Sequence, residues 1–290
     1  MTALPVIRRG FADIRAGQVH YRRAGAAGTA ALPLVMFHPS PGSSKMLEPL
    51  MARLAATRPV IAPDTLGNGD SCAPAGDAPA LDVFVAAHVE AFDALGLPRV
   101  DLYGSHTGGN IAVEIAIRHP QRVRRLILDG LSLYAADERA DMLAHYAPAV
   151  TPSPDGSHLL WIWNFVRDAY LFWPWYRRDA AHRRDVGLPS ADALHDKFVE
   201  VAKAARTYHL SYRAAIAYRK EERLPLVTVP TLLTCARTDM LLRYLDQVAA
   251  LMPCASCAIT PGLSTEADAQ QTVARMLDFL DAPGRREAAA

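Results

Sequence analysis

Short runs of aliphatic residues alternate along most of the chain with segments in which apolar residues recur at helical spacing. The runs are typical of strands covered on both faces, and they are Leu34–Phe37, Pro59–Pro63, Arg99–Tyr103, Val123–Asp129, Thr231–Ala236 and Cys257–Thr260. The segments with helical spacing are Lys45–Thr57, Ala80–Leu95, Gly109–His119, Leu241–Leu251 and Thr265–Asp281. This alternation predicts an α/β fold with a doubly wound, mostly parallel sheet whose functional groups lie at the carboxyl ends of its strands.

Two segments depart from this alternation. The segment FADIRAGQVHYRRAG contains two short alternating runs around Ala16 and Gly17, which predict a β-hairpin. From Leu131 to Leu224 only helical patterns occur, interrupted by proline and glycine, so we expect an inserted helical cap. The predicted division is a core of residues 1–130 and 225–282, a cap of residues 131–224 and a flexible tail of residues 283–290.

All four tryptophans of the chain lie in the expected cap, beside several other aromatic residues. Such residues either pack a cap onto a core or line an apolar pocket between the two, and different members can fill both roles. We consider Trp161 and His158 candidates for substrate contact. Other polar or aromatic cap residues that could face a pocket are Asp155, Tyr208, His209 and Tyr212.

The balance of charge narrows the range of partners. Lys and Arg number 31 against 30 Asp and Glu, and a net charge of +1 gives no basic surface for nucleic acid or an anionic membrane. The chain shows neither an apolar leader nor a run of the roughly 18 to 20 apolar residues that spans a bilayer. We therefore expect a cytoplasmic monomer or homodimer that acts on a small molecule and binds neither nucleic acid nor membranes.

Cys254 and Cys257 form a C-x-x-C pattern. The pattern lies in a strand-like segment and not at a helix start, and zinc would need two further ligands at suitable spacing. We interpret the two cysteines as buried structural thiols and expect neither a metal nor a cofactor.

The strongest chemical signal follows the run RVDLY. There the sequence continues GSHTGG and then enters a helical pattern, so that Gly104 and Gly108 flank His106 between a strand and a helix. A turn this sharp leaves room only for glycine on either side, and it presents the central side chain above the sheet. In this G-x-Nu-x-G pattern the sequence resembles the α/β-hydrolase family, in which the central residue is the nucleophile.

Four further segments carry the same resemblance along most of the chain. They are FHPSPGSS, similar to the family's oxyanion loop with Pro39 in place of the usual glycine; VIAPDTLGNGDS, similar to its D-x-x-G-x-G-x-S segment; RHPQRVRRLILDG; and VPTLLTCARTDM. The last of these matches the strand that delivers the acid of the catalytic triad. The resemblance implies an α/β-hydrolase fold and places the acid at Asp239, with Asp129 at another strand end as an alternative.

The sequence departs from the family pattern twice. His106 stands at the nucleophile position, while Ser105 comes one residue early and would act only if the elbow were displaced. The family's histidine after the last strand is replaced by Thr265, interpreted here as a helix N-cap, and no histidine follows His209. Ser-His-Asp acyl transfer therefore lacks both its hydroxyl and its base.

An imidazole at the elbow is well suited to acid-base chemistry, because its pKa lies near neutral pH. We hypothesise that His106 is a general base or, alternatively, a nucleophile; a residual histidine without a role is the remaining alternative. The resemblance places the oxyanion donors at the backbone N–H groups of Ser40 and Thr107, with His38 bracing the loop. Asp239 would orient a polar neighbour or cap the following helix.

These residues predict a cofactor-independent enzyme that acts on a small apolar or aromatic carbonyl or ester compound. The family favours hydrolysis. Two alternatives use the same groups: a lyase or decarboxylase, and a ligand-binding protein that has lost catalysis.

Overall fold

A computed structural model describes residues 5–25 and 29–283 of the chain. The predicted tail lies, from residue 284 onward, outside the described residues. Among the helices of the described part, none is both long and apolar enough to cross a membrane.

Eight strands within these residues form one sheet in the order β1-β2-β4-β3-β5-β6-β7-β8. The strands are β1 (Arg8–Ile14), β2 (Gly17–Ala24), β3 (Leu34–Phe37), β4 (Val60–Pro63), β5 (Val100–Ser105), β6 (Val123–Asp129), β7 (Thr231–Ala236) and β8 (Ala255–Thr260). The first two form the predicted hairpin and β2 pairs antiparallel with β4, whereas all pairings from β4 to β8 are parallel. The predicted α/β fold with a mostly parallel sheet is confirmed.

The inner parallel strands bury side chains on both faces of the sheet. In β3, Leu34 and Met36 enter the cluster shared with helices α1 (Glu48–Leu54) and α10 (Glu266–Asp281). Val35 and Phe37 enter the opposite cluster, with α2 (Leu81–Ala94), α3 (Thr107–Arg118) and α9 (Leu245–Ala250). This two-sided burial explains why the strands are continuous apolar runs, and it holds their carboxyl ends at one edge.

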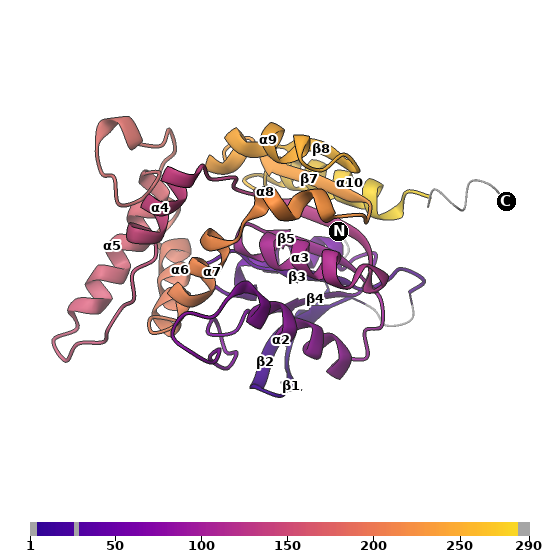
Figure 1. Ribbon diagram of the computed structural model, residues 1–290, viewed down its shortest axis with the longest axis horizontal. Helices are drawn as coiled ribbons and strands as arrows, with labels where there is room; N and C mark the ends of the chain where they lie inside the picture. Colours follow the sequence, from indigo (N-terminus) through magenta and orange to yellow (C-terminus); the bar gives the residue numbers. More distant parts are fainter. Residues whose placement is uncertain (1–4, 26–28, 284–290) are drawn as a thin grey trace.

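The segment between β6 and β7 is helical, as its pattern indicates. Its helices are α4 (Ala136–His145), α5 (Ser157–Leu171), α6 (Ala191–Lys203), α7 (Tyr208–Ala217) and α8 (Lys220–Arg223). Elsewhere and within this segment, the described residues also form the short 3-10 helices η1 (Ser44–Leu47), η2 (Pro120–Arg122), η3 (Ala180–His182), η4 (Leu224–Leu226) and η5 (Met240–Tyr244). Figure 1 shows α4 to α7 grouped on one side of the sheet. The exact boundaries between a core and a cap stay a prediction.

The cysteine prediction is wrong in one respect. Cys254 and Cys257 are exposed, whereas Cys235 is buried. The reason is the place of β8 at the end of the strand order, where it has a neighbouring strand on only one side. Burial from both faces, which the apolar run suggested, is therefore not reached at this edge.

Candidate active site

The turn between β5 and α3 is sharp, and its backbone is strained at His106. His106 adopts φ 49° and ψ −110°, a region that costs a non-glycine residue on the order of 1–3 kcal/mol. A Cβ atom at Gly104 would lie 2.6 Å from the carbonyl oxygen of Gly108, and one at Gly108 would lie 2.4 Å from that of Phe37. Glycine is thus required on both sides of His106, which the packing holds in its strained conformation.

His106 bonds directly to the acid that the sequence indicates. Its Nε2 lies 2.7 Å from Oδ2 of Asp239, across 133 residues of chain. The other carboxylate oxygen of Asp239 accepts the backbone N–H of Leu241 at 2.8 Å and caps η5. Asp239 therefore bonds a polar neighbour and also caps a helix, so the two alternatives considered for it do not exclude each other.

The carboxylate determines which nitrogen of His106 carries the proton. Because a carboxylate only accepts, Nε2 must donate, and in the neutral ring Nδ1 then keeps its lone pair. Nδ1 has no hydrogen-bond partner in the part of the chain that the structure describes. Burial alone would lower the pKa of His106, but attraction by Asp239 and the hydrogen bond outweigh it and raise that pKa. The same contacts outweigh burial at Asp239 and lower its pKa.

Asp129, the alternative acid, lies in the same neighbourhood but has other partners. Its carboxylate accepts the hydroxyl of Tyr103 at 2.7 Å and that of Thr234 at 3.1 Å. Its backbone oxygen accepts the N–H of His106 at 3.0 Å. Burial raises the pKa of Asp129. Of the two acids, Asp239 is the one whose side chain lies within hydrogen-bond reach of the His106 imidazole.

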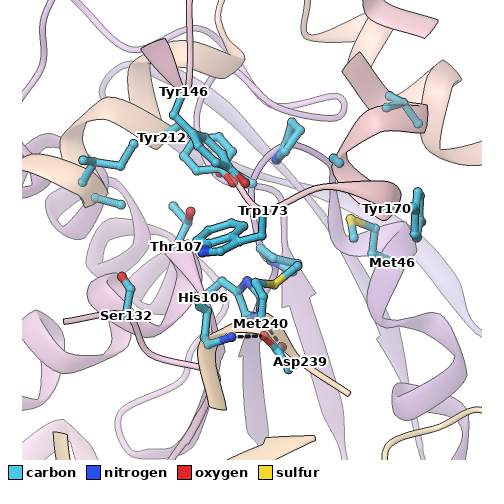
Figure 2. A pocket seen from close by; sticks show the side chains of 18 of the residues that line it. Met46, His106, Thr107, Ser132, Tyr146, Tyr170, Trp173, Tyr212, Asp239 and Met240 are labelled. Atoms are coloured by element: carbon cyan, nitrogen blue, oxygen red, sulfur yellow. Dashed lines mark hydrogen bonds and ion pairs between the residues drawn. The ribbon is translucent and has the colours of Figure 1, made fainter. Parts of the chain in front are cut away.

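His106 opens onto a cavity of about 350 Å³. The cavity is mostly apolar, and its aromatic lining consists of Tyr134, Tyr146, Phe165, Tyr170, Trp173 and Tyr212. Figure 2 shows Tyr146 with Tyr212 at one end of the view and the bonded pair of His106 and Asp239 at the other, with Trp173 drawn between. A cavity of this size at the carboxyl ends of parallel strands is suited to a small organic molecule.

Two residues predicted to contact substrate do not line this cavity. Trp161 packs against Phe165 and Trp175, with ring centroids 5.4 and 5.7 Å away. His158 lies in the first turn of α5, where Nδ1 accepts the backbone N–H of Ser153 at 3.0 Å. Of the other tryptophans in the predicted cap, Trp173 lines the cavity and Trp175 is buried in packing.

The other candidates in the predicted cap also differ in whether they line the cavity. Tyr212 lines the cavity. Tyr208 is buried and donates its hydroxyl to the backbone oxygen of Pro148 at 2.7 Å. Asp155 bonds locally to Ser153, and His209 lines a separate surface cavity.

The two residues predicted to supply the oxyanion donors line the cavity. His38, which we predicted to brace the oxyanion loop, does not. Ser40 and Thr107 both line the cavity, and Thr107 begins α3, where a helix leaves N–H groups without internal acceptors. His38 is fully buried: its Nε2 accepts the N–H of Thr65 at 3.0 Å, and its Nδ1 lies 2.9 Å from the oxygen of Pro39. His38 thus links two loops and does not face the cavity.

We also considered Ser105 as a displaced nucleophile and Thr265 as the residue in place of the family's histidine. Ser105 is buried and is not part of the cavity lining. Thr265, where the family's histidine is expected, accepts the N–H of Asp268 at 3.1 Å and caps α10, as predicted.

Two cations of the cavity were missed by sequence reasoning. Arg184 and Lys197 both line it, and burial lowers the pKa of Arg184 and lowers that of Lys197 to about 7. Nothing in the local sequence pattern distinguishes them from surface residues. Each faces the cavity only because of the course that the chain takes between β6 and β7.

One group of side chains outside the cavity lining consists of residue types that can bind a metal ion. His20, Asp64 and Asp70 place ligand atoms within 4.8 Å of one another. His20 and Asp64 already bond each other at 2.8 Å, and the backbone N–H groups of Ser44 and Asp70 also bond Asp64. This network holds the loop after β4, and none of the three residues lines the cavity.

The sheet order and the helices on both of its faces agree with a known fold family. The chain belongs to the α/β hydrolase fold family, whose model matches residues 33–263.

Curated relatives and solved structures agree with this assignment. Over 104 residues the chain is 47% identical to 2-hydroxymuconate semialdehyde hydrolase of Pseudomonas sp. (strain CF600), covering 35% of this chain and 37% of that protein. It is 41% identical over 104 residues to 2-hydroxy-6-oxo-2,4-heptadienoate hydrolase of Pseudomonas putida, covering 35% and 38%. The matches thus span little more than a third of these relatives. The enol-lactonase of Burkholderia xenovorans LB400 shares the fold, with a TM-score of 0.71, 20% identity and coverage of 93% and 99%.

Proposed function

We propose that the protein is a cofactor-independent hydrolase of small apolar or aromatic carbonyl or ester compounds, with His106 as the general base. The observation that carries the proposal is the 2.7 Å bond from His106 Nε2 to Asp239 in the lining of an aromatic cavity. This bond supports His106 as a base, because Nε2 carries the proton that is donated to Asp239 and Nδ1 keeps a lone pair that can accept another proton.

In the proposed reaction, Nδ1 takes a proton from a water molecule, and the resulting hydroxide attacks the substrate carbonyl. Asp239 stabilises the imidazolium that forms. The backbone N–H groups of Ser40 and Thr107 stabilise the oxyanion, and each such donor contributes typically about 3 to 4 kcal/mol in the transition state. Collapse of the intermediate returns the proton from His106 to the leaving group.

In this proposed arrangement, His106 takes the place of two residues of the usual triad, the nucleophile and the histidine. In Ser-His-Asp enzymes the imidazole lies between the elbow hydroxyl and the acid. Here the elbow side chain itself reaches the acid, so a second histidine after β8 would have no remaining place beside Asp239. The absence of that histidine in the sequence therefore fits the proposal.

Hydrolysis is preferred to the lyase or decarboxylase reaction because the curated relatives are named hydrolases. Their names describe small unsaturated oxo or hydroxy compounds, and we extend only that coarse substrate class to this chain. The cavity of about 350 Å³ and its aromatic lining suit substrates of this size.

The test is turnover of a panel of small aromatic esters, lactones and 1,3-diketones by the wild type and by His106→Gln. We expect the variant to lose turnover by at least about 10²-fold while it still binds ligand. His195→Gln is the matched control, because His195 is exposed on α6 and lies outside the cavity lining. Full activity in His106→Gln would refute the assignment. Labelling of the wild type by a fluorophosphonate would do the same, since it reports an activated serine. Binding without turnover of any compound would favour the ligand-binding protein.

A further inference from the structure

The loop that carries Ser40 is bonded by helix α6 at two places. The Lys197 ammonium donates to the backbone oxygen of Pro41, which follows Ser40 in the chain. Further along the same helix, the carboxylate of Glu200 accepts the hydroxyl of Ser43. Residues three apart lie on one face of a helix, so a single face of α6 makes both contacts. Glu200 also acts on Lys197 itself, because its charge raises the lysine pKa that burial lowers.

The bond between Ser43 and Glu200 is sealed from water. Ser43 is fully buried, and Glu200 is 6% exposed. Because a carboxylate only accepts, the Ser43 hydroxyl donates its proton to Glu200, while its oxygen accepts the backbone N–H of Lys45 at 3.1 Å and caps η1. A buried hydrogen bond to a charged group is stronger than one between neutral groups, and losing one partner leaves the other unpaired away from water. Glu200 therefore restricts where the loop can lie.

The core of the protein holds the loop on either side of these contacts. Before them, Nδ1 of His38 lies 2.9 Å from the backbone oxygen of Pro39. After them, Asp64 accepts both the backbone N–H of Ser44, at 2.8 Å, and its hydroxyl. Residues 40–43 lie between these two anchors, and their hydrogen bonds to described residues beyond the loop and η1 go to α6 and α7.

Ser40 lies in this stretch with its backbone N–H available to a ligand. The N–H has no acceptor in the parts of the chain that the structure describes, and Ser40, like Thr107, lines the cavity. The Ser40 hydroxyl lies 3.3 Å from that of Ser211 on α7. A backbone donor stabilises a transition state only if it is already aimed at the place where negative charge develops. The contacts that fix this stretch therefore bear on catalysis.

We propose that Glu200 is a positioning residue for the oxyanion site: by holding Ser43, its carboxylate keeps the Ser40 N–H in place to donate to the negative oxygen of the transition state. The inference rests on the proposed function, whose oxyanion donors it uses, and it adds a residue that lies outside the cavity lining. The oxyanion site is then complete only while α6 lies on the loop. Loss of the bond weakens binding of the transition state more than binding of the substrate, because the aromatic lining stays in place.

The first test separates kcat from KM. Glu200→Leu removes the acceptor, Ser43→Ala removes the donor, and Glu200→Gln keeps an acceptor in its amide oxygen. On the best substrate of the panel, we expect kcat of Glu200→Leu and of Ser43→Ala to fall about tenfold or more, with KM within about threefold of the wild type. Glu200→Gln should keep at least about a third of kcat. The double variant Ser43→Ala/Glu200→Leu should lose no more than the worse single variant, because both changes remove the same bond.

The second test needs no turnover. Phenylboronic acid takes up hydroxide to form a tetrahedral anion, whereas benzamide stays planar, so the ratio of their dissociation constants reports on the oxyanion site. Calorimetry of the intact protein at pH 8 should show a preference of the wild type for the boronate. This preference should fall about tenfold in Glu200→Leu and in Ser43→Ala and should be retained in Glu200→Gln. A merely structural role of Glu200 would weaken both ligands alike.

Asp192→Leu is the matched control. Asp192 is an exposed acid in the first turn of the same helix and lies outside the cavity lining. This variant should keep both kcat and the preference for the boronate. Thermal unfolding checks that each variant is folded, and Ser43→Ala, the smallest change, carries the test if Glu200→Leu does not fold.

Four results would overturn the proposal. They are no preference of the wild type for the boronate, unchanged kcat in folded Glu200→Leu and Ser43→Ala, equal weakening of both ligands in these variants, and a loss in Glu200→Gln as large as in Glu200→Leu. The fate of the proposed function is read separately. A protein that hydrolyses nothing but loses its boronate preference in Glu200→Leu would refute the proposed function and leave the positioning role intact. A hydrolase with unchanged kcat in both variants would do the reverse.

Discussion

Replacing Asp239 by Asn tests the tautomer argument with little change in shape. The backbone N–H of Leu241 requires an oxygen at the position of Oδ1, so the amide oxygen of Asn must take that place. The amide NH₂ then faces Nε2 of His106, where Oδ2 had accepted at 2.7 Å. Because an NH₂ group donates, Nε2 becomes an acceptor, and the neutral ring must carry its proton on Nδ1.

The expected loss follows from this reversal. With the proton on Nδ1 the ring cannot accept a proton from water in the cavity. Elsewhere, holding a catalytic histidine in the wrong tautomer lowers kcat by about 10⁴-fold, which corresponds to roughly 5 kcal/mol in the activation barrier. The acid limb of the pH-rate profile supplies a second readout. Because Asp239 outweighs burial and raises the pKa of His106, the wild-type limb should lie above about pH 6.5. In Asp239→Asn it should move to lower pH.

Two assays check this prediction. The first is kcat/KM against pH for the best substrate of the panel, and the second is ¹⁵N NMR of His106, assigned by comparison with His106→Gln, which reads the tautomer without any substrate. Asp129→Asn is the control: it has the same charge change, but its partners are Tyr103 and Thr234, and it should lose much less activity. If Asp239→Asn keeps more than a tenth of wild-type activity, or keeps the proton on Nε2, the reasoning is refuted.

Three other predictions concern the same residues. In Gly130→Ala, the new Cβ would lie 2.7 Å from Nε2 of His106 at a backbone φ of +67°, so we expect about 10²-fold lower turnover and a stability loss of about 1–2 kcal/mol by thermal unfolding. His106→Ser should remain unlabelled by fluorophosphonates, because Thr265 leaves no base beside a new hydroxyl; rapid labelling would contradict this. For stability, the lowered pKa of Asp239 contributes above its unfolded value of about 3.9, and the raised pKa of His106 contributes fully below about 6.5. The excess in Tm of the wild type over Asp239→Asn should therefore be largest between about pH 4 and 6.5 and shrink on both sides, and a constant difference would contradict the pairing.

Local sequence patterns predicted the elements on either side of the turn at His106. Val123–Asp129 and Thr231–Ala236 were predicted with their observed bounds, because strands buried on both faces must be apolar throughout. The helix after His106 begins at Thr107, two residues before the predicted start, since glycines at its first turn obscure the helical pattern. Glycines flanking a single residue between strand and helix indicated the turn, and the clashes that a Cβ would make at Gly104 and Gly108 explain why.

Long-range placement could not be derived from the same patterns. Trp161 and Trp173 lie in similar aromatic segments, yet Trp161 packs against Phe165 and Trp173 lines the cavity. Which side of a helix faces a cavity depends on where the chain between β6 and β7 crosses the sheet, and a sequence pattern records only that a side chain is apolar. The exposure of Cys257 has a similar origin, because the strand order decides which strand lies at an edge.

The sequence by itself determined the fold, and it predicted the sharp turn with His106 at its centre and two candidate acids, because these depend on local spacing and on the ends of buried strands. Only the tertiary structure decided that Asp239 bonds the imidazole of His106, whereas Asp129 accepts the hydroxyl of Tyr103. It also decided that Arg184 and Lys197 line the cavity. Each of these contacts joins residues far apart in the chain. Their geometry follows from how the sheet and its covering helices pack in space.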